Sequence, residues 1–442
     1  MILRNVRFLA DYGGGGHDDR DRRPATVVIT GDSIESVRYA AETGATHDNT
    51  IDLDGLWVLP GCIDPHVHVR DLDRRHKETW ASAGAAALAG GYTTIFDMPN
   101  TEPPTNDMPA LERKRDAAAA AAVDFRLWLG ATEDNLADLQ SILNTRPTDV
   151  AGIKVFLAGS SSNEVVHHAE TLRAIMHLAA HHELPVAVHQ ELQSCLDATP
   201  VQHLEPHARN HGLFRPRECV LAGAGLALET AAAAGCTLYL LHMSTTEEIE
   251  LLQHWKRRAP VYGEATPHHL FVDESLLQTI GNHGKVNPPL RTSEDCSALL
   301  DALSGGVIDI VGSDHAPHTL EEKAQPYLQA SSGFPGLETT LGLLLNAAAA
   351  GRLGYDRLVE ATSAVPAQLF RLADRGRVAE GKRADLTVVA PQQLWTVRPQ
   401  RFRSLAHYSP FAGMTLRGRV AATIAAGVYH PNTTEGRFDE QT

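Results

Sequence analysis

The stretch GCIDPHVHVRD, residues 61–71, closes a strongly apolar segment, residues 57–69, that has the length and composition of a buried β-strand. Side chains alternate between the two faces of a strand, so His66 and His68 point to the same side and can both reach one metal ion. Taken alone, such a pair is as consistent with packing as with metal binding. Its position at the end of the first strand of an alternating β/α chain gives it more weight.

Seven similar apolar segments follow, separated by helical stretches. The expected strands are residues 93–100, 125–131, 151–158, 184–190, 237–244, 261–269 and 308–317. The helices expected between them include residues 79–89, 110–122, 169–181, 221–234, 247–257 and 295–304. Alternating strands and helices favour parallel pairing, and eight such units predict a closed (β/α)8 barrel of the TIM type. No Gly-x-Gly-x-x-Gly sequence follows the first strand, which argues against a dinucleotide-binding fold.

The two ends of the chain have a different character. Short segments that resemble antiparallel strands are residues 2–9, 25–37, 384–389 and 415–428. We therefore predict that residues 1–56 and 378–442 form one discontinuous, small β-sandwich domain, and that residues 57–377 form the catalytic barrel. The glycine run in residues 11–23 lacks the Lys-Ser/Thr of a phosphate-binding loop, so we expect a hairpin turn there.

The charge balance limits the partners of the protein. The chain has 39 Lys and Arg against 54 Asp and Glu, a formal net charge of −15. This balance disfavours nucleic acid and anionic membranes as partners, because both need a large basic surface. A small anionic substrate remains compatible, provided that one cationic side chain lies inside the site.

Cysteine usage and the N-terminus indicate a compartment. The five cysteines are odd in number and include no CxxC pair, which favours reduced thiols over a disulfide framework. No signal-peptide-like apolar stretch opens the chain, and no apolar run approaches about 18 residues. We expect a cytoplasmic protein.

Four further strand ends carry side chains that can bind metal ions. Lys154, His189, His242 and Asp314 each lie at or near the C-terminal end of an expected barrel strand, the face where barrel enzymes carry out their chemistry. Packing alone explains such a convergence poorly. Neutral imidazoles and one carboxylate suit zinc, although manganese, cobalt and iron also accept these ligands. A lysine ammonium is a poor ligand, but its neutral amine can react with carbon dioxide to form a bridging carbamate, and burial favours the neutral amine.

Longer motifs extend this pattern to a known family. GCIDPHVHVRD, AGGYTTIFDMPNTEPPT, GKVNPPLR and GSDHAPHTLEEK, in this order, resemble the dihydroorotase family of the amidohydrolase superfamily. The resemblance covers nearly the whole barrel and reaches GKRADLTVV near the C-terminus. It implies a cyclic amide hydrolase that interconverts dihydroorotate and N-carbamoyl-L-aspartate in pyrimidine biosynthesis.

The resemblance also implies a role for each matching residue. It places one Zn²⁺ on His66 and His68 and a second on His189 and His242, with carboxylated Lys154 bridging the two ions. Asp314 would bind the first ion and shuttle a proton as the catalytic residue. The positions expected to contact the substrate are Arg70, Asn100 and His318 for its carboxylate and Asn287 for its ring.

Some features depart from the family pattern or leave alternatives open. Arg70-Asp71-Leu72-Asp73 replaces the common Arg-Glu-Pro-Gly, and Arg70 could instead form a salt bridge with Asp71 or Asp73. Allantoinase or hydantoinase activity and a non-catalytic scaffold are the alternative functions. Residues 159–163 or 325–336 could form a lid or ordinary surface loops. We also expect a homodimer or a higher homo-oligomer.

Overall fold

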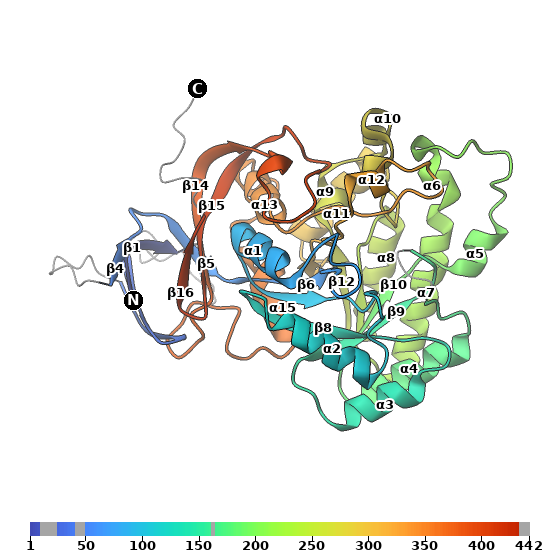
Figure 1. Cartoon of the computed structure of the whole chain (residues 1–442), viewed down its shortest axis with the longest axis horizontal. Coiled ribbons are helices and arrows are strands. Elements are labelled where there is room, and N and C mark those ends of the chain that lie inside the picture. Colours follow the sequence, from blue (N-terminus) through green and yellow to red (C-terminus); the bar gives the residue numbers. More distant parts are fainter. Residues whose placement is uncertain (9–23, 40–48, 161–163, 433–442) are drawn as a thin grey trace.

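The computed structural model describes residues 1–8, 24–39, 49–160 and 164–432. Within these ranges the chain forms a barrel surrounded by helices and, beside it, a separate sheet to which both ends of the chain contribute (Figure 1). The predicted hairpin at residues 11–23 lies outside the described residues.

Eight parallel strands form the barrel, in the order in which they occur in the sequence. They are β6 (Cys62–Val67), β7 (Tyr92–Asp97), β8 (Asp124–Gly130), β9 (Val150–Phe156), β10 (Val186–His189), β11 (Leu238–Leu240), β12 (Val261–Ala265) and β13 (Ile310–Val311). The last strand meets the first just beyond their ends, where Val67 bridges His315 and the His68 N–H donates to the His315 carbonyl at 2.7 Å. The predicted (β/α)8 barrel is confirmed.

Helices connect the strands and cover the outside of the barrel (Figure 1). The longer ones are α1 (Trp80–Gly90), α2 (Met108–Ala118), α3 (Leu136–Asn144), α4 (Ala169–His181), α7 (Arg217–Ala234), α8 (Thr246–Trp255), α11 (Ser293–Ser304) and α13 (Thr340–Ala349). The shorter ones are α5 (Gln193–Ala198), α6 (His211–Phe214), α9 (Pro267–Phe271), α10 (Leu277–Ile280), α12 (Leu320–Lys323), α14 (Tyr355–Val359) and α15 (Val365–Leu369). Their ends follow capping chemistry: Thr79 and Ser82 form a capping box at the start of α1, and Gly91 ends it with φ 88°.

Aromatic side chains fill the end of the barrel opposite the strands' C-terminal ends. Trp128 and Tyr239 stack inside it, and Phe370, which follows α15, packs edge-on against both and against Phe96. This closed, apolar floor leaves the C-terminal mouth as the face at which a site can form.

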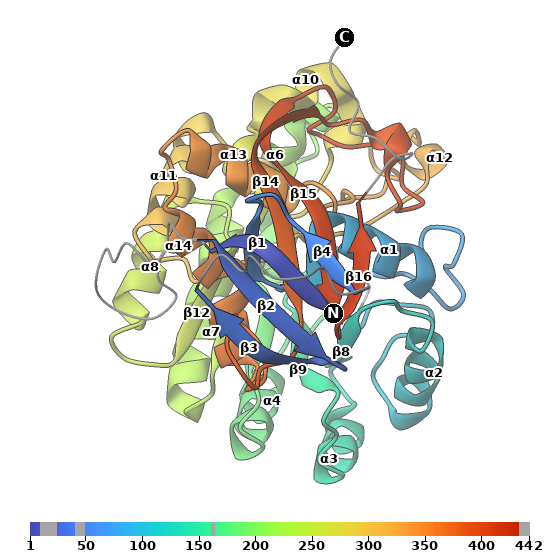
Figure 2. The same ribbon diagram turned by 90° about the vertical axis from the view of Figure 1, so that its left-hand side faces the viewer.

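The terminal sheet combines strands from both ends of the chain. Its strands are β1 (Ile2–Phe8), β2 (Ala25–Thr30), β3 (Ser33–Arg38), β4 (Thr50–Asp52), β5 (Trp57–Pro60), β14 (Leu386–Thr396), β15 (Thr415–Ala425) and β16 (Val428–Pro431). They run in the order β16-β15-β14-β5-β1-β2-β3, and β4 also pairs with β1. Figure 2 shows the N-terminal strands crossing in front of β14 and β15, and residues of both layers, such as Leu3, Val27, Leu386 and Ile424, share one apolar core.

The strand expected at residues 57–69 is in fact two strands in different sheets. β5 pairs with β14 and β1 in the terminal sheet, whereas β6 begins the barrel. The chain crosses between the sheets at Gly61, where an added Cβ would lie 2.3 Å from Thr93 Oγ1. The domain boundary between residues 56 and 57 stays a prediction. In the structure, residues 57–60 pair with strands of the terminal sheet.

One cysteine expectation is wrong. Cys195, in α5, and Cys219, in α7, form a disulfide, whereas Cys62, Cys236 and Cys296 are free. The two disulfide cysteines are 24 residues apart in sequence, and the absence of a CxxC pair gave no indication of their contact. The pair removes one of the arguments for a cytoplasmic location.

Candidate active site

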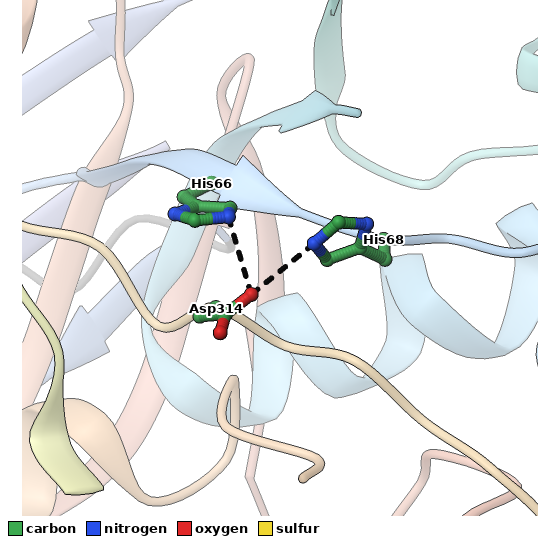
Figure 3. A group of neighbouring side chains, drawn as sticks. All are labelled: His66, His68 and Asp314. Atoms are coloured by element: carbon green, nitrogen blue, oxygen red, sulfur yellow. Dashed lines mark hydrogen bonds and ion pairs between the residues drawn. The ribbon is translucent and has the colours of Figure 1, made fainter. Parts of the chain in front are cut away.

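Three predicted metal ligands meet directly at the barrel mouth. His66 Nε2 and His68 Nε2 lie 3.1 and 3.2 Å from the same oxygen, Oδ1 of Asp314 (Figure 3). All three side chains are buried, and their ligand atoms lie close enough together to hold one metal ion. The end of β6 and the segment after β13 bring them together across the seam at which the barrel closes.

Several of these side chains depend on unusual backbone conformations. His242 and Asp314 follow strands that end earlier than expected, at Leu240 and Val311, and both have left-handed backbones, with φ of 34° and 46°. Arg70 also has a positive φ, 67°. Such conformations cost about 1–3 kcal/mol each in non-glycine residues and concentrate at functional sites.

Neighbouring side chains fix the orientation of the first two rings. His66 Nδ1 contacts Glu264 Oε1 at 2.7 Å, and His68 Nδ1 donates to Asn100 Oδ1 at 2.6 Å. Each ring therefore presents Nε2 to Asp314. Burial lowers the pKa of His66, but the charges of Glu264 and Asp314 outweigh burial and raise it to about 9.

The environment of His68 fits a bound cation. Burial, together with the charge of Arg70, lowers its pKa to about 3, so the ring is neutral. Its proton is on Nδ1, which leaves a lone pair on Nε2 facing the carboxylate of Asp314. Two acceptors at 3.2 Å repel each other unless a cation lies between them, and imidazole and carboxylate are ligands that divalent transition metals accept.

A second pair of histidines lies beside the first group. His189 Nδ1 and His242 Nε2 face each other at 3.0 Å. The other nitrogen of His189 contacts Glu191 Oε2 at 3.0 Å, and Arg215 binds that carboxylate through two nitrogens, at 2.7 and 2.8 Å. His242 Nδ1 is buried and has no hydrogen-bond partner among the residues that the structure describes. Both histidines line the same cavity as the first group.

Lys154 also lines this cavity, with its side chain buried. Its side chain is 1% exposed, and among the described residues its ammonium has no hydrogen-bond or salt-bridge partner; Nζ lies 4.4 Å from the centroid of the Phe156 ring. Burial lowers its pKa to about 7, although the negative charges of Asp314 and Glu264 oppose this shift. A substantial fraction of neutral amine near pH 7 is the form that can react with carbon dioxide.

Arg70 is a second buried cation without an acceptor. Its Nε and Nη1 atoms are buried and have no hydrogen-bond partner in the part of the chain that the structure describes. Its Nη2 lies 3.5 Å from His318 Nε2, but that nitrogen carries a proton directed at the Ser332 carbonyl, because Nδ1 accepts from Lys77. Within the described ranges, no salt bridge joins Arg70 to Asp71 or Asp73, so that alternative is wrong. Burial lowers the Arg70 pKa to about 10 and, helped by the charge of Arg70, lowers the His318 pKa to about 3.

The carboxylates that were candidates to pair with Arg70 have other partners. Asp71 accepts from the N–H groups of Leu72 and Trp80, and Asp73 contacts Arg113 at 3.4 Å. Neither carboxylate therefore neutralises the Arg70 guanidinium, which is buried behind His318, a residue that lines the outer part of the cavity.

The two predicted asparagine contacts lie in different places. Asn100 holds the ring of His68, so its oxygen supports a candidate metal ligand. Asn287 lines both parts of the cavity, and its Oδ1 lies 3.0 Å from His211 Nε2. The outer part has a volume of about 610 Å³ and continues inward past Ser160, Asn287 and Ser332.

Two buried lysines fix the loop of residues 325–336, one of the two lid candidates. The Lys285 ammonium donates to the carbonyls of Tyr327 and Ala330, at 2.8 and 2.7 Å. The Lys323 ammonium donates to the carbonyls of Lys285, Ser331 and Gly333, at 3.0, 3.0 and 3.1 Å. In this structure the loop therefore lines the cavity and is held in place by these hydrogen bonds. The other candidate, residues 159–163, includes residues 161–163, which lie outside the described residues.

The residues that support the candidate ligands did not stand out in the sequence. Glu264 contacts the ring of His66, and Glu191 contacts the ring of His189. Arg215 binds Glu191. One signal was present: Glu264 interrupts the buried strand VYGEA, where an isolated carboxylate is costly.

Comparison with known proteins identifies the family. The model of the amidohydrolase family matches residues 57–429, which include the barrel and most of the C-terminal strands. The chain belongs to the amidohydrolase family. Curated relatives of this amidohydrolase include dihydroorotases from Halobacterium salinarum, 37% identical over 89% of this chain and 90% of the relative, and Methanosphaera stadtmanae, 32% identical over 97% and 95%.

Solved structures agree with the fold of this amidohydrolase. The L-hydantoinase (dihydropyrimidinase) from Arthrobacter aurescens superimposes with a TM-score of 0.90 at 29% identity, over 97% of this chain and 95% of that chain. The dihydropyrimidinase from Brevibacillus agri gives a TM-score of 0.86 at 26% identity. Among the described residues, no helix has the length and apolar character needed to span a membrane.

Proposed function

We propose that this amidohydrolase is a dihydroorotase, which interconverts dihydroorotate and N-carbamoyl-L-aspartate by opening and closing a cyclic amide. The observation that carries the proposal is the Arg70 guanidinium, buried beside the candidate metal ligands and lacking an acceptor among the described residues. A substrate carboxylate would supply that acceptor in the bidentate geometry that arginine favours. The names of the curated relatives support the same activity.

The proposed cofactor is a pair of divalent ions, of which zinc fits the ligands best. His66, His68 and Asp314 would hold the first, His189 and His242 the second, and carboxylated Lys154 both. When bound, such ions acidify a water molecule and polarise a carbonyl group. The neutral state of His68, the unpaired Lys154 and the facing nitrogens of His189 and His242 are the features that support this assignment.

The side chains of this chain would divide the remaining work between them. Arg70 would bind the substrate carboxylate, and His318 would join it by turning its Nε2–H from the Ser332 carbonyl to the substrate. Asn287 would contact the ring from the cavity wall. Asp314 would take the proton released when water attacks the ring carbonyl and deliver it to the leaving ring nitrogen. Its position supports this role, because Oδ1 faces both His66 and His68.

Hydantoinase activity is the second candidate, because solved structures similar in shape to this chain include hydantoinases. An unsubstituted hydantoin ring lacks a carboxylate and would leave the buried charge of Arg70 without an acceptor. A substrate that leaves a buried polar group of the site without a partner is bound and turned over poorly, because desolvation of that group is not compensated.

A side-by-side assay tests the proposal. The purified protein, loaded with Zn²⁺ in bicarbonate buffer, is assayed with dihydroorotate, hydantoin and allantoin, and its metal content is measured. We expect kcat/KM for dihydroorotate to exceed the other two by at least about a hundredfold. A preference for hydantoin or allantoin would replace the proposed substrate, and a metal-free, inactive protein would favour the scaffold alternative.

Several accompanying predictions stay open. A role in pyrimidine biosynthesis follows from the proposed substrate pair. Cytoplasmic location and a homodimer or higher homo-oligomer remain predictions, which cell fractionation and light scattering of the purified protein can test.

A further inference from the structure

Glu264 contacts both groups of candidate metal ligands. It lies on β12 with its side chain completely buried. Its Oε1 atom lies 2.7 Å from the ring Nδ1 of His66 and accepts the backbone N–H of His242 at 2.9 Å. One carboxylate oxygen therefore binds a ligand of the first group through its ring and a ligand of the second group through its main chain.

The other supporting residues contact only one group. Asn100 holds the ring of His68, and Glu191, itself held by Arg215, holds the ring of His189. In the described part of the chain, Nδ1 of the His242 ring has no such partner, so the backbone contact with Glu264 is a main restraint on the position of His242.

The surrounding barrel fixes the Glu264 carboxylate. The Tyr239 hydroxyl, from β11, donates to Oε2, and Tyr239 stacks on Trp128 in the closed floor of the barrel. On the other side, an added Cβ on Gly312 would lie 2.2 Å from Oε2 and 3.0 Å from His66 Cβ. Glycine at this position leaves the space that the carboxylate occupies.

We propose that Glu264 is a positioning residue that couples the two metal subsites, so that its loss weakens metal binding at both together. The inference rests on the proposed two-metal site. A carboxylate bonded to the far nitrogen of a metal-binding histidine fixes its tautomer and orientation, and loss of such a contact typically costs about 10- to 100-fold in metal affinity. Through the His242 main chain, the same oxygen places a ligand of the second subsite.

The test compares Glu264→Gln with Glu191→Gln. Both replacements keep the side-chain shape and remove one buried carboxylate, but Glu191 contacts His189 alone among the candidate ligands. The metal-free proteins are titrated with Zn²⁺ in bicarbonate buffer against a chromophoric chelator, which resolves two binding steps. We expect Glu264→Gln to weaken both steps by about 10- to 100-fold and Glu191→Gln to weaken one. Weakening of one step or of neither by Glu264→Gln would overturn the proposal.

A second variant covers the case in which Glu264→Gln does not fold. Tyr239→Phe removes the donor to Oε2 and leaves both Oε1 contacts in place, and thermal unfolding of the metal-free protein checks its fold. We expect a smaller weakening that again affects both steps; a folded Tyr239→Phe protein with unchanged or one-sided binding would contradict the coupling. Wild-type activity on dihydroorotate separates this result from the proposed function, because Glu264 can fail the test while the enzyme binds two ions and turns over.

Discussion

One lysine, Lys154, is buried in the inner part of the cavity, and another, Lys323, is buried beside the loop that forms a wall of that cavity. The two ammonium groups differ in their hydrogen bonding. Lys323 donates to three carbonyl oxygens around the loop of residues 325–336. Lys154 is buried to a similar degree, yet its ammonium has no hydrogen-bond acceptor among the described residues. Burial lowers the pKa of both. The comparison distinguishes a lysine whose hydrogen bonds hold a loop from one whose amine is kept available for chemistry.

Lys154→Ala is expected to have the largest effect. If Lys154 becomes the bridging ligand, its loss should lower kcat/KM for dihydroorotate by about 10³-fold or more, because the ions that activate water lose a shared ligand. Zinc content should fall below two per chain. Stability should change little or increase, since an unpaired buried charge is removed. A variant that retains both activity and two zinc ions would show that Lys154 is not a ligand.

Arg70→Ala tests the other buried cation that lacks an acceptor. We expect KM for dihydroorotate to rise by about 10²- to 10³-fold, because a buried charge pair with the substrate is lost. Hydantoin turnover should stay the same or rise, since that ring carries no carboxylate and the unpaired charge that disfavours it is removed. Arg70→Lys should give an intermediate KM, because the charge remains but the planar fork does not. Equal losses on charged and neutral rings would contradict carboxylate binding.

Lys323→Met tests whether the hydrogen bonds of Lys323 hold the loop of residues 325–336 in place. The replacement leaves three carbonyls without their donor, and we expect the free energy of unfolding to fall by about 2–4 kcal/mol. Hydrogen exchange in residues 325–336 should become faster, and KM should rise several-fold, because the Ser332 carbonyl holds His318. Zinc content should stay at the wild-type value. Loss of zinc with unchanged stability would contradict the assignment of Lys323 to the loop and of Lys154 to the metal site.

The pH dependence of stability gives the smallest predicted effect. Burial, with the charge of Arg215, lowers the pKa of His211 to about 3, and the ring accepts from Tyr327 and donates toward Val286 as a neutral imidazole. Below about pH 6.5 the unfolded chain binds a proton that the folded protein does not. The free energy of unfolding should therefore fall as pH falls, by up to about 1.4 kcal/mol per pH unit for this group.

Urea unfolding of the metal-free protein at pH 7.5 and 5.0 measures that effect. His211→Gln should lose less stability on acidification than the wild type, whereas His177→Gln, at an exposed position, should behave like the wild type. If both variants keep the wild-type pH dependence, His211 is not the buried neutral group that the structure indicates.

The barrel, and the presence of most of the candidate residues at its mouth, could be predicted from the sequence. Apolar segments of strand length marked the strands, and each candidate ligand stood at a strand end, so parallel pairing alone brought His66, His189 and Asp314 to one face. The terminal strands were also recognised from both ends of the chain. These inferences rely on local periodicity and on one rule of topology.

Contacts between distant segments could not be predicted in this way. The local sequence shows that Glu264 is buried, but not that its oxygen meets His66 from β6 and His242 beyond β11. The acceptors of Lys323 are loop carbonyls whose directions no side-chain pattern encodes. Because the apolar pattern continues across Gly61, the change of sheet between β5 and β6 left no break in periodicity.

The terminal sheet has a consequence for how the protein is made. β1 and β5 emerge early from the ribosome, but β14, which covers the free edge of β5, follows only after the entire barrel has been synthesised. During that interval β5 presents unpaired N–H and C=O groups, and such an edge can pair with another nascent chain. A messenger truncated before the codon for Leu386 would make this exposure permanent. We therefore expect such chains to aggregate and to require chaperones even though every candidate metal ligand is present.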